Sequence, residues 1–93
     1  MTATQTQLEK EAEAKGNAYA KKRGWWFCKF TSPGKKSVPD RLFIRRGRHV
    51  FIEWKREGEE PTPQQLKRHR EMREHGAEVH WVDNLTDFMR ILR

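Results

Sequence analysis

The sequence lacks several features that define whole classes of protein. Cys28 is the single cysteine among 93 residues, so an internal disulfide and a thiolate zinc cluster are both excluded. No apolar run approaches the roughly 20 residues that span a bilayer. The polar segment from Met1 to Glu9 has no apolar signal-peptide core. We therefore expect an intracellular, cytoplasmic protein with no membrane partner.

Apolar residues are also scarce: 34% of the chain is hydrophobic and 35% is charged. This composition predicts one small domain with a modest core. Aromatic residues make up 11%, including four tryptophans, and so many large rings argue against a disordered chain. The net charge of +7 favours a polyanionic partner, usually nucleic acid. A charge that serves solubility alone is the alternative.

Apolar periodicity and turn residues predict an α/β fold in the order α-β-β-β-α-β-α, with a sheet that helices must cover. The helices are expected over residues 5–23, 62–75 and 85–92, and the strands over 25–30, 40–45, 49–55 and 78–82.

Two short sequence patterns predict where the second helix begins and whether the first helix is continuous. Thr62, Pro63 and Gln65 form a capping-box pattern, which predicts that the second helix begins there. Gly16 interrupts the first helix with a residue of low helix propensity, so we expect this helix to bend or to start late at that point.

The pattern most informative about chemistry is made by Asp40, Glu53 and Lys55. Glu53 and Lys55 are two positions apart on one strand, so their side chains leave the same face of the sheet. A hairpin turn at Arg46-Gly47 would set Asp40 opposite Glu53, whereas a turn at Gly47-Arg48 would set it opposite Lys55. Either register brings the three side chains to one face.

Carboxylates that face each other across a sheet repel unless a cation lies between them. Oxygen donors without a soft ligand favour Mg²⁺ or Mn²⁺. Such a site suits phosphodiester hydrolysis, in which Lys55 orients or deprotonates a water or stabilises the developing negative charge. The alternative is a surface salt-bridge cluster of Asp40, Glu53 and Lys55 that contributes little to stability.

The residues around this candidate site resemble the motifs of a known protein family. Pro39-Asp40 followed by Glu53-Trp54-Lys55 resembles the PD-(D/E)xK nuclease motif. The ordered set from about Glu13 to Val82 is similar to a stand-alone VRR-NUC (virus-type replication-repair nuclease) domain. The further elements of that set are Gly24, Ser32-Pro33-Gly34 and Thr62-Pro63-Gln64-Gln65. The resemblance implies a single domain over residues 1–93, with a restriction-endonuclease-like α-β-β-β-α-β core, a mixed sheet flanked by helices and a short C-terminal helix.

The resemblance also implies roles for individual residues. Asp40 and Glu53 would bind Mg²⁺ or Mn²⁺ with the backbone carbonyl of Trp54, and Lys55 would be catalytic. Glu13 would face the metal through water, although Glu9 or Glu11 could take that position and Glu13 could be an ordinary helix charge. Gln65 would act beside the site or serve only as a capping-box partner. The family often has glycine where this chain has Ser37, so the loop before Asp40 is expected to differ.

Small stand-alone members of the family, often from phages, act as homodimers on branched DNA such as Holliday junctions. We therefore expect a homodimeric, structure-selective DNA endonuclease, in the host cell if a phage encodes it. A nuclease for linear or flap DNA and a non-catalytic nucleic-acid-binding module are the alternatives.

The adjacent Trp25 and Trp26 should face opposite sides of the sheet. We expect one of them in the core and the other at an interface, under a helix or against a base. The basic residues expected to flank the site and contact DNA are Lys35, Lys36, Arg41, Arg45, Arg46 and Arg48.

Overall fold

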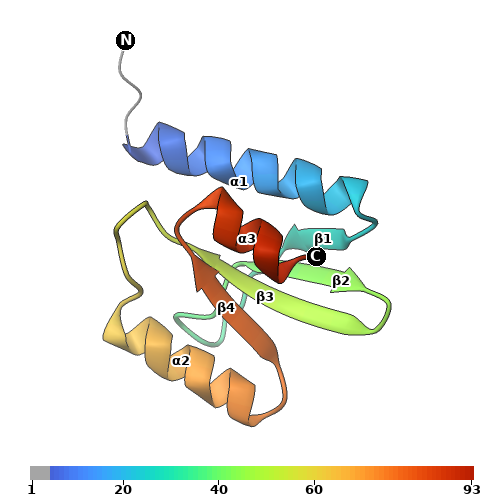
Figure 1. Cartoon of the computed structure of the whole chain (residues 1–93). Helices are drawn as coiled ribbons and strands as arrows, with labels where there is room; N and C mark the ends of the chain where they lie inside the picture. The colour runs from blue at the N-terminus through green and yellow to red at the C-terminus, as the bar shows by residue number, and fades with distance from the viewer. Residues whose placement is uncertain (1–4) are drawn as a thin grey trace.

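The computed structural model describes residues 5–93, with side chains from Leu8 onward. The elements are α1 (Gln5–Lys22), β1 (Trp26–Lys29), β2 (Arg41–Arg45), β3 (Arg48–Trp54), α2 (Pro63–Glu74), β4 (Glu78–Val82) and α3 (Leu85–Ile91). A four-stranded sheet lies between helices (Figure 1), in the strand order β1-β2-β3-β4. The first two pairings are antiparallel and β3 pairs with β4 in parallel. The mixed α/β fold predicted from the sequence is thus confirmed.

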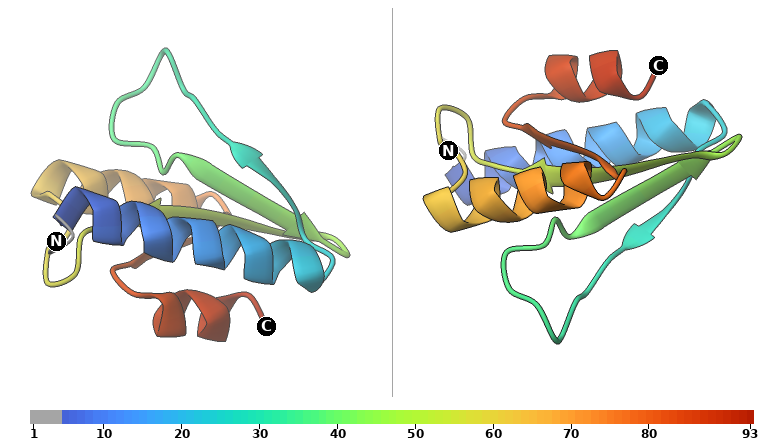
Figure 2. Two further views of the ribbon diagram at one scale, coloured as in Figure 1. Left: turned by 90° about the horizontal axis from the view of Figure 1, so that it is seen from above. Right: turned by 90° about the horizontal axis from the view of Figure 1, so that it is seen from below.

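The helices divide between the two faces of the sheet. α1 and α3 lie together on one face, and the loop between β1 and β2 projects on the opposite side (Figure 2). α2 packs against β4. In the part of the chain that the structure describes, no helix combines the length and apolar character needed to cross a bilayer.

The hairpin between β2 and β3 follows the first of the two predicted registers. Arg46 and Gly47 have positive φ values of 49° and 80°, as a two-residue hairpin turn requires. Arg45 pairs with Arg48 at the turn, and Arg41 pairs with Ile52 at the far end. Asp40, the next residue before β2, is therefore in register with Glu53.

The main core lies between the sheet and the pair α1 and α3. Alternate residues of the central hairpin point into it, because successive side chains of a strand face opposite sides. The rings of Phe43 and Trp54 pack against Phe88 of α3, with centroid distances of 5.3 and 5.1 Å. The buried members of this core are Ala20, Trp25, Phe43, Val50, Ile52, Trp54, Val82, Phe88 and Leu92.

Gly16 does not break α1, contrary to the sequence-based expectation, since the helix is continuous from Gln5–Lys22. Gly16 is buried, and a Cβ at this position would lie 3.0 Å from both Trp54 and Phe88. The glycine is therefore explained by the close approach of α1 to these two rings.

The predicted opposition of the adjacent tryptophans is also confirmed. Trp25 is 4% exposed, and its indole Nε1 donates a hydrogen bond to the Leu92 carbonyl at 3.2 Å. Trp26 is 60% exposed. Its cross-strand partner is Ile44, and Cys28 and Leu42 form the next pair on the same face, opposite α1 and α3. One apolar part of the sheet is thus left outside the core.

Candidate active site

The two carboxylates of the proposed site meet at one end of the sheet. The Phe30 N–H donates to the Asp40 carbonyl at 2.7 Å, which extends the β1–β2 ladder to the position of Asp40. Burial and then the negative charge of Glu53 raise the pKa of Asp40, the Arg41 guanidinium lowers it, and Glu13 raises it further. Asp40 therefore carries its negative charge at an energetic cost, among other carboxylates.

Lys55 lies directly beyond β3, where its N–H donates to the Val82 carbonyl at 2.8 Å. Its side chain is 12% exposed and its Nζ lies 3.3 Å from Glu59 Oε1. The same Nζ donates to Gln65 Oε1 at 3.4 Å. An amine held by a carboxylate and an amide oxygen has a restricted orientation.

Gln65 is a capping-box partner whose side chain also contacts Lys55. Its Oε1 accepts a 2.9 Å hydrogen bond from the Thr62 N–H, and its own N–H donates to Thr62 Oγ1 at 3.1 Å, which completes the predicted capping box. Because Lys55 donates to the same Oε1, the start of α2 is tied to the lysine of the site.

Among the three glutamates considered on α1, Glu13 is the one whose negative charge raises the pKa of Asp40. Its Oε1 accepts from Arg41 Nε at 3.0 Å, which holds it over the beginning of β2. Glu9 lies 3.6 Å from the Arg56 guanidinium instead, and Glu11 is exposed. Of these three glutamates, Glu13 therefore has the contact with β2 and the charge effect on Asp40, and its role toward a metal stays a prediction.

The donor set fits a hard divalent cation. Within residues 8–93, no three His, Cys, Asp or Glu side chains form a preassembled metal cluster. The site instead offers Asp40 and Glu53, whose crowding raises the pKa of Asp40 and would be relieved by a cation. Mg²⁺ needs only one or two carboxylates, since it keeps several waters. Trp54 is 6% exposed and its ring packs in the core. Its backbone carbonyl is therefore the part of this residue that could bind the metal.

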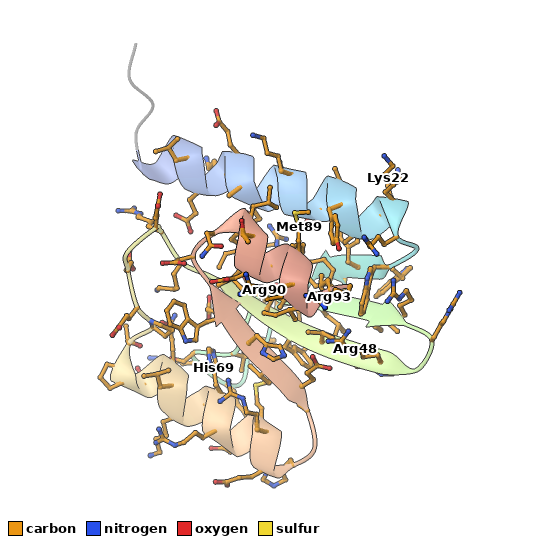
Figure 3. The ribbon with its side chains drawn as sticks, viewed as in Figure 1. Lys22, Arg48, His69, Met89, Arg90 and Arg93 are labelled. Atoms are coloured by element: carbon orange, nitrogen blue, oxygen red, sulfur yellow. The ribbon has the colours of Figure 1, made fainter. Side chains whose placement is uncertain are left out.

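Sequence reasoning missed His69, which belongs to the same group of side chains. His69 is fully buried on α2, and Figure 3 shows it on the side of the helix that faces the sheet. Its Nε2 lies 3.7 Å from Glu53 Oε1. The signal in the sequence was helical spacing: His69 follows Gln65 by four residues, so both lie on the same face of α2.

The basic residues of the hairpin do not all flank the site: the expected position was wrong for Arg45, Arg46 and Arg48, whereas their contact with DNA stays a prediction. These residues lie at the turn, the opposite end of the β2–β3 pairing from Asp40. Arg45 donates to the carbonyls of Arg23 and Arg93, and its guanidinium lies 4.5 Å from the Trp25 ring centroid. Arg48, labelled in Figure 3, binds Glu78 through hydrogen bonds of 2.8 and 2.6 Å.

The loop before Asp40 keeps exposed cations near the site. Lys35 and Lys36 are exposed, and the Lys36 carbonyl accepts a 3.0 Å hydrogen bond from Arg68 Nε of α2. Ser37 has a φ of 64°, a conformation that favours glycine. The serine therefore adopts the backbone geometry for which the family's glycine is suited, and the loop reaches Pro39 and Asp40 in spite of this substitution.

Comparisons with known proteins agree with this fold. No family model matches the chain. The chain is 44% identical over 57 residues to "Putative nuclease p44" of Acyrthosiphon pisum secondary endosymbiont phage 1. This match covers 60% of the chain and 61% of that protein, so the chain spans less than two thirds of this relative. A solved structure described as "VRR_NUC domain" is similar at a TM-score of 0.71 and 31% identity, over 87% of this chain and 94% of that one.

The mixed sheet between helices, together with the similarity to the VRR_NUC structure, places the chain in the restriction-endonuclease-like class of fold. The chain belongs to the VRR-NUC domain family, and it resembles the stand-alone, phage-type members.

Proposed function

We propose that this chain is a metal-dependent DNA endonuclease that hydrolyses phosphodiester bonds. The observation that carries the proposal is the β2–β3 register, which sets Asp40 opposite Glu53, with Lys55 directly beyond the end of β3. Two carboxylates and one amine on one side of the sheet provide oxygen donors for Mg²⁺ or Mn²⁺ and a group for acid–base or electrostatic catalysis.

Each residue has a proposed task. Asp40 and Glu53, with the Trp54 carbonyl, would hold the metal, and Glu13 would contact it through water. The bound metal would polarise the phosphoryl oxygen and lower the pKa of a water molecule. Lys55, held by Gln65 and Glu59, would orient that water or stabilise negative charge on the phosphate.

The exposed lysines of the loop before Asp40 support DNA as the substrate. Lys35 and Lys36 lie on the segment that leads into the site, and the whole chain carries a net charge of +7. Cations beside a phosphodiesterase site contact the backbone phosphates and position the scissile bond. Arg41 is paired with Glu13, so we assign it to the organisation of the site rather than to a free DNA-contacting surface.

We further propose that the protein acts as a homodimer on branched DNA. Trp26 is 60% exposed and lies with Cys28, Leu42 and Ile44 on the sheet face opposite α1 and α3. A second copy would cover this apolar surface. Because a two-fold dimer carries two active sites, it could cut a four-way junction symmetrically.

Cleavage assays with four-way-junction, flap and linear duplex DNA test the activity and its selectivity. Wild type should cut in Mn²⁺ or Mg²⁺ and not in EDTA, with the junction cut fastest. Lys55→Ala should lose at least 100-fold in rate, within the ~10²–10⁴-fold range of acid–base catalysis. Lys22→Ala is the matched control, because Lys22 is exposed at the end of α1 that is distant from the site (Figure 3).

The outcomes separate the competing functions. Faster cutting of linear or flap DNA would keep the nuclease and reject junction selectivity. Salt-dependent binding of every DNA without cleavage by wild type would favour the non-catalytic binding module. Light scattering tests the assembly: wild type should have the mass of a dimer, and Trp26→Glu that of a monomer. A monomeric wild type would reject the dimer.

A further inference from the structure

His69 is buried at a position where its polar atoms are poorly accommodated. The side chain is fully buried, and neither ring nitrogen has a hydrogen-bond partner among the residues that the structure describes. A buried polar group without a partner destabilises the folded state, so an apolar side chain would pack better at this position. The presence of histidine therefore calls for an explanation other than packing.

The side chains around the His69 ring suggest why a histidine is present. Its Nε2 lies 3.7 Å from Glu53 Oε1, slightly beyond hydrogen-bond length. A small rotation of the Glu53 carboxylate would complete the bond, and such bonds often tighten only when an active site is loaded.

His69 is also one half of a matched arrangement. Glu53 and Lys55 are two residues apart at the end of β3, and Gln65 and His69 are four residues apart on α2. Gln65 lies 3.4 Å from Lys55 as His69 lies 3.7 Å from Glu53. One face of α2 thus provides a partner for Glu53, on β3, and for Lys55, directly beyond its end.

We propose that His69 is a positioning residue for Glu53, a role that rests on the proposed function. The Nε2–H donates to one carboxylate oxygen of Glu53, which leaves the other oxygen for a divalent cation. Hydrogen bonds of this kind fix the orientation of a metal-binding carboxylate and increase its affinity for the metal.

Binding of Mn²⁺ alone to the full chain, measured by isothermal titration calorimetry without DNA, tests this role. His69→Leu removes both nitrogens while it keeps an apolar volume. We expect its Mn²⁺ affinity to fall roughly 10- to 100-fold, the usual effect of losing such a partner. The unfolding temperature in EDTA should stay unchanged or rise, because two unpaired nitrogens are removed. A purely structural residue would give a lower unfolding temperature.

Two further variants sharpen the result. His69→Gln keeps an N–H donor on a side chain of similar reach, so it should recover most of the Mn²⁺ affinity. His75→Gln is the matched control, since His75 is exposed at the end of the same helix and should leave Mn²⁺ binding unchanged.

These measurements distinguish a failure of the proposed His69 role from a failure of the proposed metal-dependent function. If wild type binds Mn²⁺ and His69→Leu binds it equally well, the positioning role is rejected and the proposed function survives. If His69→Leu unfolds and His69→Gln is stable but binds no better than Glu53→Gln, the role is also rejected. If wild type itself binds no Mn²⁺, the proposed metal-dependent function fails, and the role of His69 fails with it.

Discussion

Asp40 lies opposite Glu53, one position beyond the Arg41–Ile52 pair of β2 and β3, and the charge of Glu53 adds to the effect of burial in raising the pKa of Asp40. Like charges at facing positions of a sheet destabilise the fold. The protein therefore maintains an unfavourable pair of carboxylates in the place where the proposed reaction needs two anionic oxygen donors.

Asp40→Asn should separate stability from function. In EDTA at neutral pH, the free energy of unfolding should rise by up to about 1 kcal/mol, because a facing pair of like charges is removed. Mn²⁺ binding and DNA cleavage should be lost. Urea unfolding and calorimetry measure the two effects. Glu74→Gln, at an exposed position of α2, should change neither. A lower stability for Asp40→Asn in EDTA would contradict the proposed charge conflict.

Gly16→Ala should destabilise the protein, although alanine favours a helix by about 1 kcal/mol over glycine. The new Cβ would lie 3.0 Å from the buried rings of Trp54 and Phe88, and overpacking of this kind costs about 1–3 kcal/mol. We expect a net loss of about 1 kcal/mol in urea unfolding.

Ala18→Gly is the matched control for that substitution, because Ala18 is exposed on the same helix. It should cost about 1 kcal/mol through helix propensity alone. If Gly16→Ala stabilised the protein by the amount that Ala18→Gly destabilises it, the close approach of α1 to the two rings would not be limiting.

Ser37→Gly should stabilise the loop before Asp40. Ser37 has a φ of 64°, and a left-handed conformation costs a residue with a Cβ roughly 1–2 kcal/mol. Part of this gain is offset, because glycine has more freedom in the unfolded chain. We expect an increase of up to about 1 kcal/mol in the free energy of unfolding. Ser32→Gly, in the same loop at a position without a positive φ, should lower stability.

The ion pair between Glu78 and Arg48 should make stability depend on pH. The Arg48 guanidinium, with a smaller contribution from His80, lowers the pKa of Glu78 from 4.5 to about 2. A lowered carboxyl pKa stabilises the folded state above pH 4.5, and this stabilisation is lost as the pH falls through about 2.

Glu78→Gln should therefore cost about 1 kcal/mol at pH 7, a value reduced for solvent screening because both side chains are partly exposed. The difference from wild type should shrink at pH 3 and disappear near pH 2, as followed by urea unfolding at each pH. A difference that stays constant over this range would show that the Glu78 charge is not its cause.

Several structural features of this protein could be predicted from short stretches of its sequence. The strand at 78–82 was predicted at its observed bounds. The capping box at Thr62 and Gln65 placed the start of α2 correctly. The hairpin limited Asp40 to two registers, and both brought it to the face of Glu53 and Lys55. These features are readable because turns, caps and strand alternation depend on residues that are close in sequence.

Tertiary structure decided what depends on contacts between distant segments. The pairing of Glu13 with Arg41, and of Glu9 with Arg56, depends on how α1 lies over the sheet. The reason for Gly16 is the approach of the Trp54 and Phe88 rings, and the importance of His69 depends on α2 packing against the strand that carries Glu53. The sequence alone determined which side chains share an element and a face, because that is a matter of helix and strand geometry. Which faces meet was decided by the packing of the layers, which no local pattern encodes.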